Sequence, residues 1–417
     1  MTLKAVLLDL DDTLVHIDTE LFTRRYIDLI GSFVAARFST ITADQFKKAV
    51  ISATRQVSRD LDPMRLNQAV INASINAAVS VPTLQLDNAM VEFFDGPYRT
   101  LSSLAAPMTG GRQLIDWILA HNIILVIATN PLFPSQATYE RMRWAELDPL
   151  HRGFALITTA NNSHFTKPNI AYYSEILAKI GVDAAQALMV GDSFESDIQP
   201  ALAAGMSTYW TMPNLSVADP AGADRFGRGS LPDLTAKLVT GWPPVNAIPS
   251  NGNPAQVMSR LTATVAALNS LSMRLYDNSV PRNISDWSTS DLPNPPALKS
   301  PSEVMVYWSL WEAEFNRPTL ERIAEEDNPF ISPPPLEITS RRARSIPELV
   351  HTFGTERGHT LFFLASLRPD DWNRPARDSV FGSTTLLDMA NLIQRHDRQL
   401  LARLNELIRD REEQQQS

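Results

Sequence analysis

Three carboxylates stand directly after an apolar run at the start of the chain. In "KAVLLDLDDTLV", residues 4–15, four apolar residues lead into Asp9, Asp11 and Asp12. Carboxylates at the end of a buried strand repel one another unless a positive charge lies between them. Mg²⁺ supplies such a charge because it is a hard ion that prefers oxygen ligands. A carboxylate in this place can also act as a nucleophile, and a second one can transfer protons.

Further polar residues follow other apolar runs. Thr129 and Asn130 come after "IILVIA", Lys167 lies in the loop after residues 154–157, and "GDSFESD" (191–197) comes after "ALMV". In open α/β sheets, functional groups gather beyond the carboxyl ends of the strands. The sequence therefore predicts one rim that carries carboxylates, a hydroxyl, an amide and an ammonium group. This combination suits phosphoryl transfer with Mg²⁺.

The elements that must position these residues are short apolar strands separated by helical sequence. Continuous apolar runs without polar alternation are typical of a parallel sheet that is covered on both faces. The predicted fold is an α/β, Rossmann-like parallel sheet, with an inserted α-helical segment at 16–107. The predicted strands are 5–8, 123–128, 154–157, 187–190 and 208–210.

The C-terminal part differs in character from the sheet domain. After a linker at 241–253, rich in Pro, Gly and Asn, four helical patterns are joined by Pro-rich loops, which predicts a separate all-α four-helix bundle. The predicted core domain is 1–15 with 108–240, and the bundle is 254–417. The predicted helices are 254–277, 301–326, 345–367 and 385–412.

Composition excludes several classes of protein. The chain has 417 residues, a net charge of −9 and no cysteine, so thiolate nucleophiles and cysteine metal clusters are excluded. The acidic balance argues against nucleic-acid binding. No apolar run reaches about 18 residues, so we expect no membrane association and a cytoplasmic location.

The motifs resemble, in order and spacing, those of the haloacid dehalogenase-like (HAD) hydrolase superfamily. The matching residues are "DLDDT" (9–13), Thr129, Lys167 with Pro168, and "GDSFESD", and the resemblance covers roughly 1–240. It implies that Asp9 is the nucleophile and a Mg²⁺ ligand. It also implies that Asp11 is the general acid/base and binds the metal through its backbone carbonyl.

The resemblance assigns the remaining site residues as well. Thr129, with Asn130 beside it, would bind the phosphoryl group, and Lys167 would offset charge on the nucleophile and the phosphate. Asp192 would be a further metal ligand, and Asp197 would support it or orient Lys167. An acid at position 11 favours a phosphatase over a dehalogenase, which has no poor leaving group to protonate. The insertion looks like a C1-type cap, which would select a small phosphorylated metabolite.

The C-terminal helices resemble the DinB-like four-helix bundle family over about 254–410. The resemblance rests on segments 300–331 and 384–404 and on "LRPDDWNRP" before the last helix. Its members often bind a divalent metal through three histidines. Here Tyr307 and Leu400 stand at two of those positions and only His396 remains, so we expect no metal and a core histidine. The resemblance implies a homodimer through the bundle.

Three functions stay open at this point. The leading prediction is a Mg²⁺-dependent phosphatase that works through an aspartyl-phosphate, with the bundle serving interaction or dimerisation. The second is a non-catalytic binding or scaffold protein that uses the HAD fold as a sensor, which an absence of turnover with retained Mg²⁺ affinity would favour. The third is a metal- and thiol-dependent transferase centred on the bundle, which bound zinc or nickel would favour.

Overall fold

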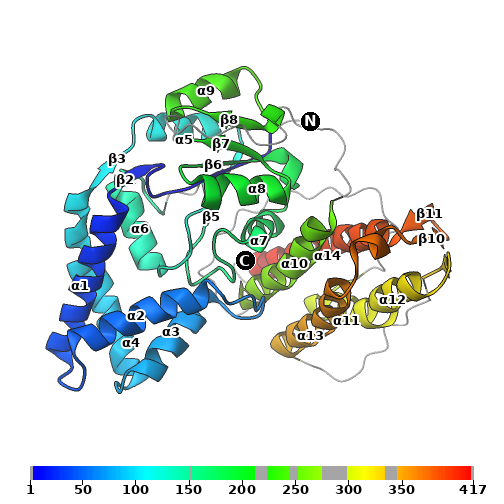
Figure 1. Ribbon diagram of the computed structural model, residues 1–417, viewed down its shortest axis with the longest axis horizontal. Helices are drawn as coiled ribbons and strands as arrows, with labels where there is room; N and C mark the ends of the chain where they lie inside the picture. Colours follow the sequence, from blue (N-terminus) through cyan, green and yellow to red (C-terminus); the bar gives the residue numbers. More distant parts are fainter. Residues whose placement is uncertain are drawn as a thin grey trace. The chain divides into compact units, whose positions relative to one another are not determined.

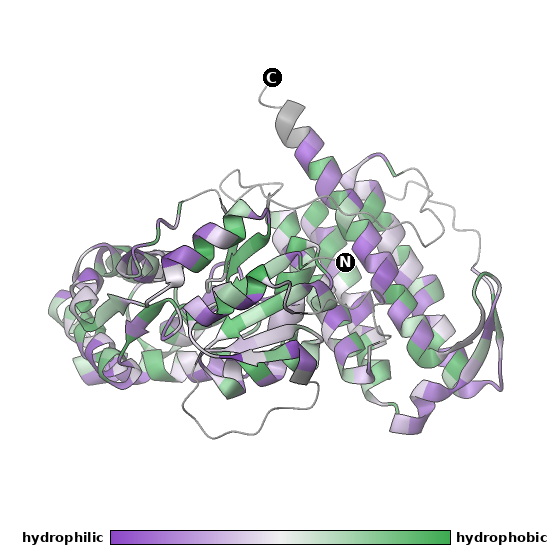
Figure 2. Cartoon of the chain, turned by 90° about the horizontal axis from the view of Figure 1, so that it is seen from above, coloured by the Kyte–Doolittle hydropathy of each residue, from purple (hydrophilic) through white to green (hydrophobic). Residues whose placement is uncertain are grey.

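A six-stranded parallel sheet forms the centre of the N-terminal unit. Its strand order is β5 (Phe154–Ile157), β4 (Ile124–Ile127), β1 (Ala5–Leu8), β6 (Ala187–Gly191), β7 (Ser207–Trp210) and β8 (Phe226–Arg228). The predicted α/β Rossmann-like class and the five predicted strands are confirmed. β1 and β6 are buried along their whole length, and Figure 2 shows the sheet as mainly hydrophobic. This burial explains why the strands lack polar alternation.

The sixth strand, β8, was missed by the sequence analysis. Its segment "FGR" holds only one large apolar residue and a glycine, which weakens any strand pattern. A Cβ on Gly227 would lie 2.8 Å from the side chains of Trp242 and Tyr209. The strand therefore depends on a close approach that the sequence pattern does not show.

The computed structural model describes residues 3–150, 153–211, 223–243, 252–274, 298–333 and 345–414. Contacts divide the chain into one unit of Met1–Tyr173 with Val182–Ala247 and another of Ser174–Gly181 with Ile248–Ser417. Most of the predicted linker lies outside the described residues, as do parts of the predicted Pro-rich loops and the last three residues. The second unit also includes 174–181, which the sequence analysis assigned to the core domain.

Helices connect the parallel strands, as that topology requires. α5 (Gly111–Ala120) and α9 (Leu231–Val239) pack against each other on one side of the sheet, and α8 (Gln199–Ala204) lies on the other side (Figure 1). α6 (Ser135–Trp144) follows β4, and α7 (Ile170–Ile180) follows β5. Short turns are η2 (Ala184–Gln186), the π-helical η3 (Phe194–Ile198) and η4 (Ala223–Arg225).

The segment between β1 and β4 is helical, as predicted. It contains α1 (Thr19–Arg37), α2 (Ala43–Val57), α3 (Asn67–Ala78), α4 (Thr83–Asp95) and η1 (Pro97–Leu104). A two-stranded antiparallel ribbon, β2 (Val15–Ile17) with β3 (Ala105–Pro107), joins its two ends and was not predicted. α2 begins with a capping box in which Thr42 and Gln45 satisfy each other's backbone N–H groups.

Apolar and aromatic side chains fill the space between the inserted helices and the sheet domain. Phe22, Tyr26 and Phe93 contact the buried ring of Tyr98, which stacks on Trp144 at 5.5 Å between centroids. Among the described residues, no single helix is long and apolar enough to cross a membrane. α3 and the α4–η1 stretch pass that test only as a pair bent by 118°.

The four helical segments predicted for the C-terminal region are helices in the structure. They are α10 (Pro254–Arg274), α11 (Pro301–Trp311) continuing through the π-helical η5 (Glu312–Asn316) into α12 (Arg317–Glu325), α13 (Ile346–Ala365) and α14 (Leu386–Gln414). α10, α11, α13 and α14 pack against one another. The region also contains the short turn η6 (Pro369–Asn373) and a three-stranded sheet that was not predicted: β9 (Phe330–Ile331), β10 (Pro375–Asp378) and β11 (Gly382–Thr385).

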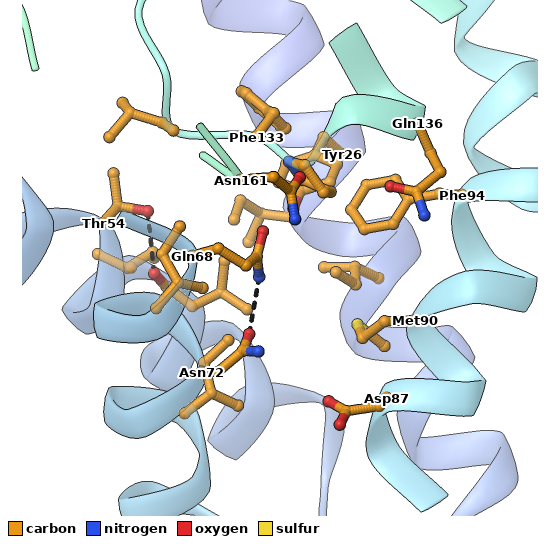
Figure 3. A pocket seen from close by; sticks show the side chains of 18 of the residues that line it. Tyr26, Thr54, Gln68, Asn72, Asp87, Met90, Phe94, Phe133, Gln136 and Asn161 are labelled. Carbon is orange, nitrogen blue, oxygen red and sulfur yellow. Dashed lines mark hydrogen bonds between the residues drawn. The ribbon is translucent and has the colours of Figure 1, made fainter. Parts of the chain in front are cut away.

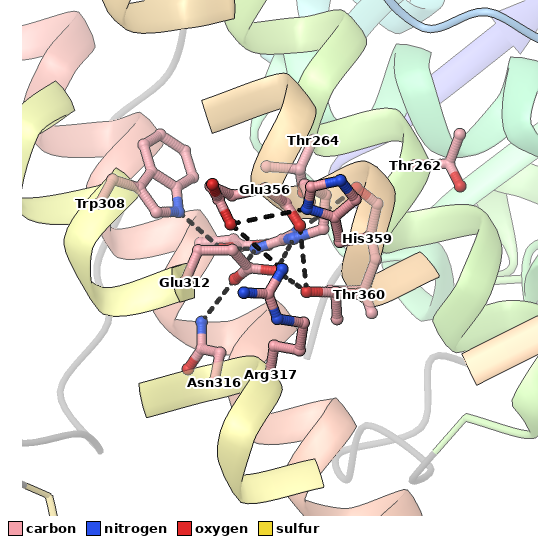
Figure 4. Close-up of polar contacts among 12 residues, drawn as sticks. Thr262, Thr264, Trp308, Glu312, Asn316, Arg317, Glu356, His359 and Thr360 are labelled. Atoms are coloured by element: carbon pink, nitrogen blue, oxygen red, sulfur yellow. Dashed lines mark hydrogen bonds and ion pairs between the residues drawn. The ribbon is translucent and has the colours of Figure 1, made fainter. Parts of the chain in front are cut away.

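A fully buried ion network lies among these C-terminal helices. Arg357 donates hydrogen bonds to both carboxylate oxygens of Glu312, at 2.7 and 3.0 Å, and to both of Asp397, at 2.6 and 2.9 Å. Trp308 donates to Asp397 at 2.8 Å, and Thr360 donates to Glu312 at 2.6 Å (Figure 4). The charges of these three side chains are paired and hydrogen-bonded, which a buried ion network needs in order to be tolerated in the core.

Candidate active site

The register of the sheet brings the predicted site residues to one edge. Leu8 at the end of β1 pairs with Ile127 of β4 on one side and with Val190 of β6 on the other. Asp9 and Thr129 therefore leave the sheet at the same level as "GDS" at 191–193. The backbone N–H of Asp9 donates to the carbonyl of Val190 at 2.9 Å, which ties the first acid to the strand that leads into the fourth motif, "GDSFESD".

Lys167 lies between two carboxylates of this edge. Its Nζ is 2.6 Å from Oδ1 of Asp9 and 2.5 Å from Oδ1 of Asp197, and the lysine side chain is only 3% exposed. Burial alone would lower the pKa of this ammonium group, but the carboxylates of Asp197 and Asp9 raise it well above the ordinary value. The lysine is therefore charged at neutral pH. It donates a hydrogen bond to Oδ1 of Asp9, the residue predicted to be the nucleophile.

Three carboxylates lie close together at this edge, and two of them contact the ammonium group. Oxygen atoms of Asp9, Asp192 and Asp197 all lie within 4.8 Å of one another. Burial, together with the charges of Asp9 and Asp197, raises the pKa of Asp192 to about 8. Burial also raises the pKa of Asp197 to about 6 against the opposing charge of Lys167. The site carries more negative charge than Lys167 neutralises, and an additional hard cation fits this donor set.

Residues of the loop after β6 contact the carboxylate of Asp197 closely. The backbone N–H of Ser193 donates to Oδ2 of Asp197 at 3.1 Å, and Asp197 sits in the π-helical turn η3. A Cβ on Gly191 would lie 2.3 Å from Oδ2 of Asp197. The glycine is required because any side chain there would displace the carboxylate that binds Lys167.

Thr129 and Asn130 are anchored by their own surroundings. Thr129 is 2% exposed, and its carbonyl accepts hydrogen bonds from the hydroxyls of Thr158 at 2.7 Å and Tyr172 at 2.8 Å. Oδ1 of Asn130 accepts from the backbone N–H of Lys167 at 3.3 Å. These bonds fix the β4 loop against the Lys167 loop. Sequence reasoning missed Thr158 and Tyr172 because neither belongs to a motif.

Asp11 lies apart from the three-carboxylate group and forms an ion pair with Arg141 of α6. Arg141 is 2% exposed, and its guanidinium carbon lies 4.7 Å from the centre of the Phe133 ring. Burial raises the pKa of the Asp11 carboxyl, and Arg141 opposes this shift. The side chain of Asp11 therefore contacts Arg141 rather than the other predicted metal ligands.

Sequence reasoning missed Arg141, although a weak signal was present. In "SQATYERMRW", Ala137 and Thr138 lie four and three residues before Arg141, and all three fall on the buried face of α6. An arginine at a core-facing position needs a buried partner. The sequence does not show that this partner is Asp11, which is 130 residues earlier in the chain.

Comparisons with known proteins agree with this arrangement. Residues 3–205 match the model of the family described as haloacid dehalogenase-like hydrolase. Residues 206–417 lie outside that match, so it gives no information on the helical C-terminal region. The match includes the inserted helices together with all the motifs that form the rim.

Curated relatives are similar to parts of the chain. A glyceraldehyde 3-phosphate phosphatase from Methanothermobacter thermautotrophicus is 32% identical over 87 residues, 20% of this chain, and the chain spans only 38% of that relative's length. The pyrimidine 5′-nucleotidase PynA from Streptococcus pneumoniae is 23% identical over 220 residues, which are 51% of this chain and 86% of the relative. Among solved structures, a HAD phosphatase from Thermococcus onnurineus is 17% identical, with a TM-score of 0.38, covering 57% of this chain and 98% of that one.

Three observations concern the same part of the chain. They are the carboxylates beside one buried lysine, the parallel sheet that positions these side chains, and the family match. Residues 3–205 of this chain therefore form a haloacid dehalogenase-like hydrolase domain.

Proposed function

We propose that the chain is a Mg²⁺-dependent phosphatase that hydrolyses phosphoric monoesters through an aspartyl-phosphate on Asp9. The observation that carries the proposal is the Asp9 carboxylate, buried at the sheet edge and bound by Lys167 at 2.6 Å. The lysine holds the carboxylate in place and offsets its charge and that of an incoming phosphate. The phosphatase and the nucleotidase among the relatives support the same reaction class.

The reaction has two steps that share the same residues. First, an oxygen of Asp9 attacks phosphorus, the bond from phosphorus to the ester oxygen breaks, and Asp11 donates a proton to the departing oxygen. Then Asp11, now a carboxylate, takes a proton from water as the water oxygen attacks phosphorus. The bond from phosphorus to Asp9 breaks, which releases phosphate and restores the enzyme. The raised pKa of Asp11 suits a residue that must carry a proton in the first step.

The residues around Asp9 fit a bound Mg²⁺ ion. Asp9, Asp192 and the backbone carbonyl of Asp11 would hold it, with Asp197 beside them bound to Lys167. When bound, the ion supplies positive charge that stabilises the phosphoryl oxygens. Thr129 and Asn130 lie at the same edge, where they would bind the phosphoryl group.

The helical insertion and the C-terminal region have supporting roles in the proposal. α1 to α4 and η1 would act as a C1-type cap that excludes water and selects the substrate. We propose that the C-terminal helices form a DinB-like bundle that serves interaction or homodimerisation. Tyr307 and His396 lie with their Oη and Nε2 3.5 Å apart, so one imidazole and a phenol stand where that family has metal-binding histidines.

The decisive test is Asp9→Asn in the full-length protein. Hydrolysis of 4-nitrophenyl phosphate should fall by at least about 10³-fold, because the amide cannot form the acyl phosphate. Treatment with EDTA should also abolish turnover, and added Mg²⁺ should restore it. Asp116→Asn, an exposed aspartate on α5, is the control and should leave activity unchanged. Activity that survives in Asp9→Asn or in EDTA contradicts the proposal.

The scaffold hypothesis has a distinct outcome in the same assay. If the wild-type protein turns over no phosphate ester but still binds Mg²⁺, the site is a sensor rather than a catalyst. The panel should include glyceraldehyde 3-phosphate and pyrimidine nucleotides, since two relatives are named for those substrates.

A further inference from the structure

A cavity of about 570 Å³ lies within the helical insertion. Its walls come from α1, α2, α3 and α4, and the loop after β4 closes one side with Leu132, Phe133 and Pro134. Figure 3 shows Tyr26, Phe94 and Met90 around it. The volume is within the range of sites that bind small organic molecules.

The cavity contains almost no charge. Only two of its lining residues are charged, Arg55 and Asp87, and these have opposite signs and are exposed. The deep wall is made of apolar side chains such as Ile30, Val50 and Phe94, each 7% exposed or less. A carboxylate or a second phosphate placed against this wall would lose its water without gaining a partner, which is strongly unfavourable.

One polar group in the wall lacks a partner. The side-chain amide of Gln68 donates to Oδ1 of Asn72 at 2.7 Å, while its own Oε1 is buried and accepts no hydrogen bond from any residue that the structure describes (Figure 3). A buried acceptor without a donor is costly, so a ligand that offers an N–H or O–H group would be favoured here. The site thus selects for a neutral molecule with at least one donor.

The cavity is bordered by the loop that follows Thr129 and Asn130. Phe133, four residues after Thr129, forms part of the cavity wall. Its ring also contacts the guanidinium group of Arg141, which pairs with Asp11. Asn67, at the start of α3, donates hydrogen bonds to the carbonyls of Pro131 at 3.2 Å and Phe165 at 3.4 Å. The insertion is therefore fastened to both loops that carry the phosphate-binding residues.

We propose that this cavity receives the leaving group, and that the substrates are phosphate monoesters of bulky, uncharged, mainly apolar alcohols that carry a hydrogen-bond donor. This inference rests on the proposed phosphatase function and narrows it. Phosphorylated carboxylic acids and bisphosphates are excluded by the same charge argument.

A matched pair of substrates tests the charge argument. 4-Carbamoylphenyl phosphate and 4-carboxyphenyl phosphate have the same shape, but the first is neutral outside its phosphate and offers an N–H donor. The full-length protein with Mg²⁺ should show a kcat/KM at least about tenfold higher for the carbamoyl compound. Gln68→Leu should lower kcat/KM for the carbamoyl compound more than for phenyl phosphate, which offers no donor outside its phosphate, because the acceptor is gone.

A pair of tryptophan variants tests the location. Val91→Trp adds volume at a half-exposed residue that lines the cavity, whereas Asn88→Trp adds it at an exposed residue of the same helix outside the lining. The first should raise KM for 4-carbamoylphenyl phosphate about tenfold and leave the hydrolysis of acetyl phosphate unchanged. The second should change neither.

The outcomes separate this inference from the function on which it rests. If no phosphate ester is hydrolysed, the proposed function fails. If esters are hydrolysed but the carboxylated compound is equally good, or Val91→Trp behaves like Asn88→Trp, the catalytic proposal stands and the cavity assignment is overturned.

Discussion

Replacing Lys167 by methionine tests the electrostatic design of the site most directly. The change keeps the volume of the side chain but removes the ammonium group that lies 2.6 Å from Asp9 and 2.5 Å from Asp197. The three side chains are 3%, 9% and 2% exposed, so water cannot replace the lost charge. Removing one partner of such a buried pair costs about 3–5 kcal/mol.

The cost should depend on pH, because the variant can relieve the repulsion by taking up a proton. Asp192, with a pKa of about 8, already carries a proton over much of this range, and Asp197 has a pKa of about 6 even with the lysine present, so Asp197 takes up the additional proton. Protonating a carboxyl group with an ordinary pKa of about 3.9 costs about 1.36 kcal/mol for each pH unit above that value. The relief therefore costs about 3 kcal/mol at pH 6 and about 5.5 kcal/mol at pH 8. Destabilisation should be about 3 kcal/mol at pH 6 and rise toward 5 kcal/mol at pH 8.

The assay is urea unfolding of the wild type and the variant at pH 6 and pH 8, followed by tryptophan fluorescence. Lys48→Met, an exposed lysine of α2, is the matched control and should change the free energy of unfolding by less than about 0.5 kcal/mol. Turnover of Lys167→Met should also fall by about 10²–10³-fold. A loss below about 1 kcal/mol at both pH values, or a loss that does not grow with pH, refutes the reasoning.

Two further predictions concern residues outside the motifs. Arg141→Met should lower kcat/KM at least about tenfold and cost about 1–3 kcal/mol of unfolding free energy, a cost that is moderated because the Asp11 side chain is 34% exposed. Arg143→Met, on the exposed face of α6, should do neither, and equal effects of the two substitutions would show that the pairing of Arg141 with Asp11 contributes nothing specific. Burial lowers the pKa of His396 to about 4, so the folded state favours the neutral imidazole. The stability that depends on this neutral form is fully present above pH 6.5 and is lost as the pH falls toward 4. The free energy of unfolding should therefore drop by up to about 3 kcal/mol over that interval, and His396→Gln should flatten the pH profile; an unchanged profile in chemical denaturation would contradict this.

Much of the active site could be predicted because it is encoded locally. Asp9, Thr129 and Asp192 each follow an apolar strand, and parallel strands place their carboxyl ends at one edge whatever fills the rest of the fold. Lys167 was found because it belongs to a motif, and the structure places it on Asp9 and Asp197. The role of each of these residues in catalysis is a proposal that the variants above test.

His396 shows where a local pattern gives only part of the answer. It was expected to be a hydrogen-bonded core histidine on the apolar face of the last helix. In the structure its side chain is partly buried, Nε2 lies 3.5 Å from the hydroxyl of Tyr307, and Nδ1 has no partner among the described residues. Helical spacing identifies the face of α14, but the partner comes from α11, 89 residues earlier.

By itself, the amino-acid sequence determined the parallel sheet, the helical character of the insertion and of the C-terminal region, and the set of acids and the lysine at the strand ends. These follow from the hydrophobic pattern, which can be read over a few residues at a time, and from the alternation of strands and helices along the chain. Only the tertiary structure decided that Arg141 pairs with Asp11, that Gly191 makes room for Asp197, and that the inserted helices enclose a nearly uncharged cavity. Burial and charge compensation arise from side chains far apart in the sequence, so no local pattern contains them.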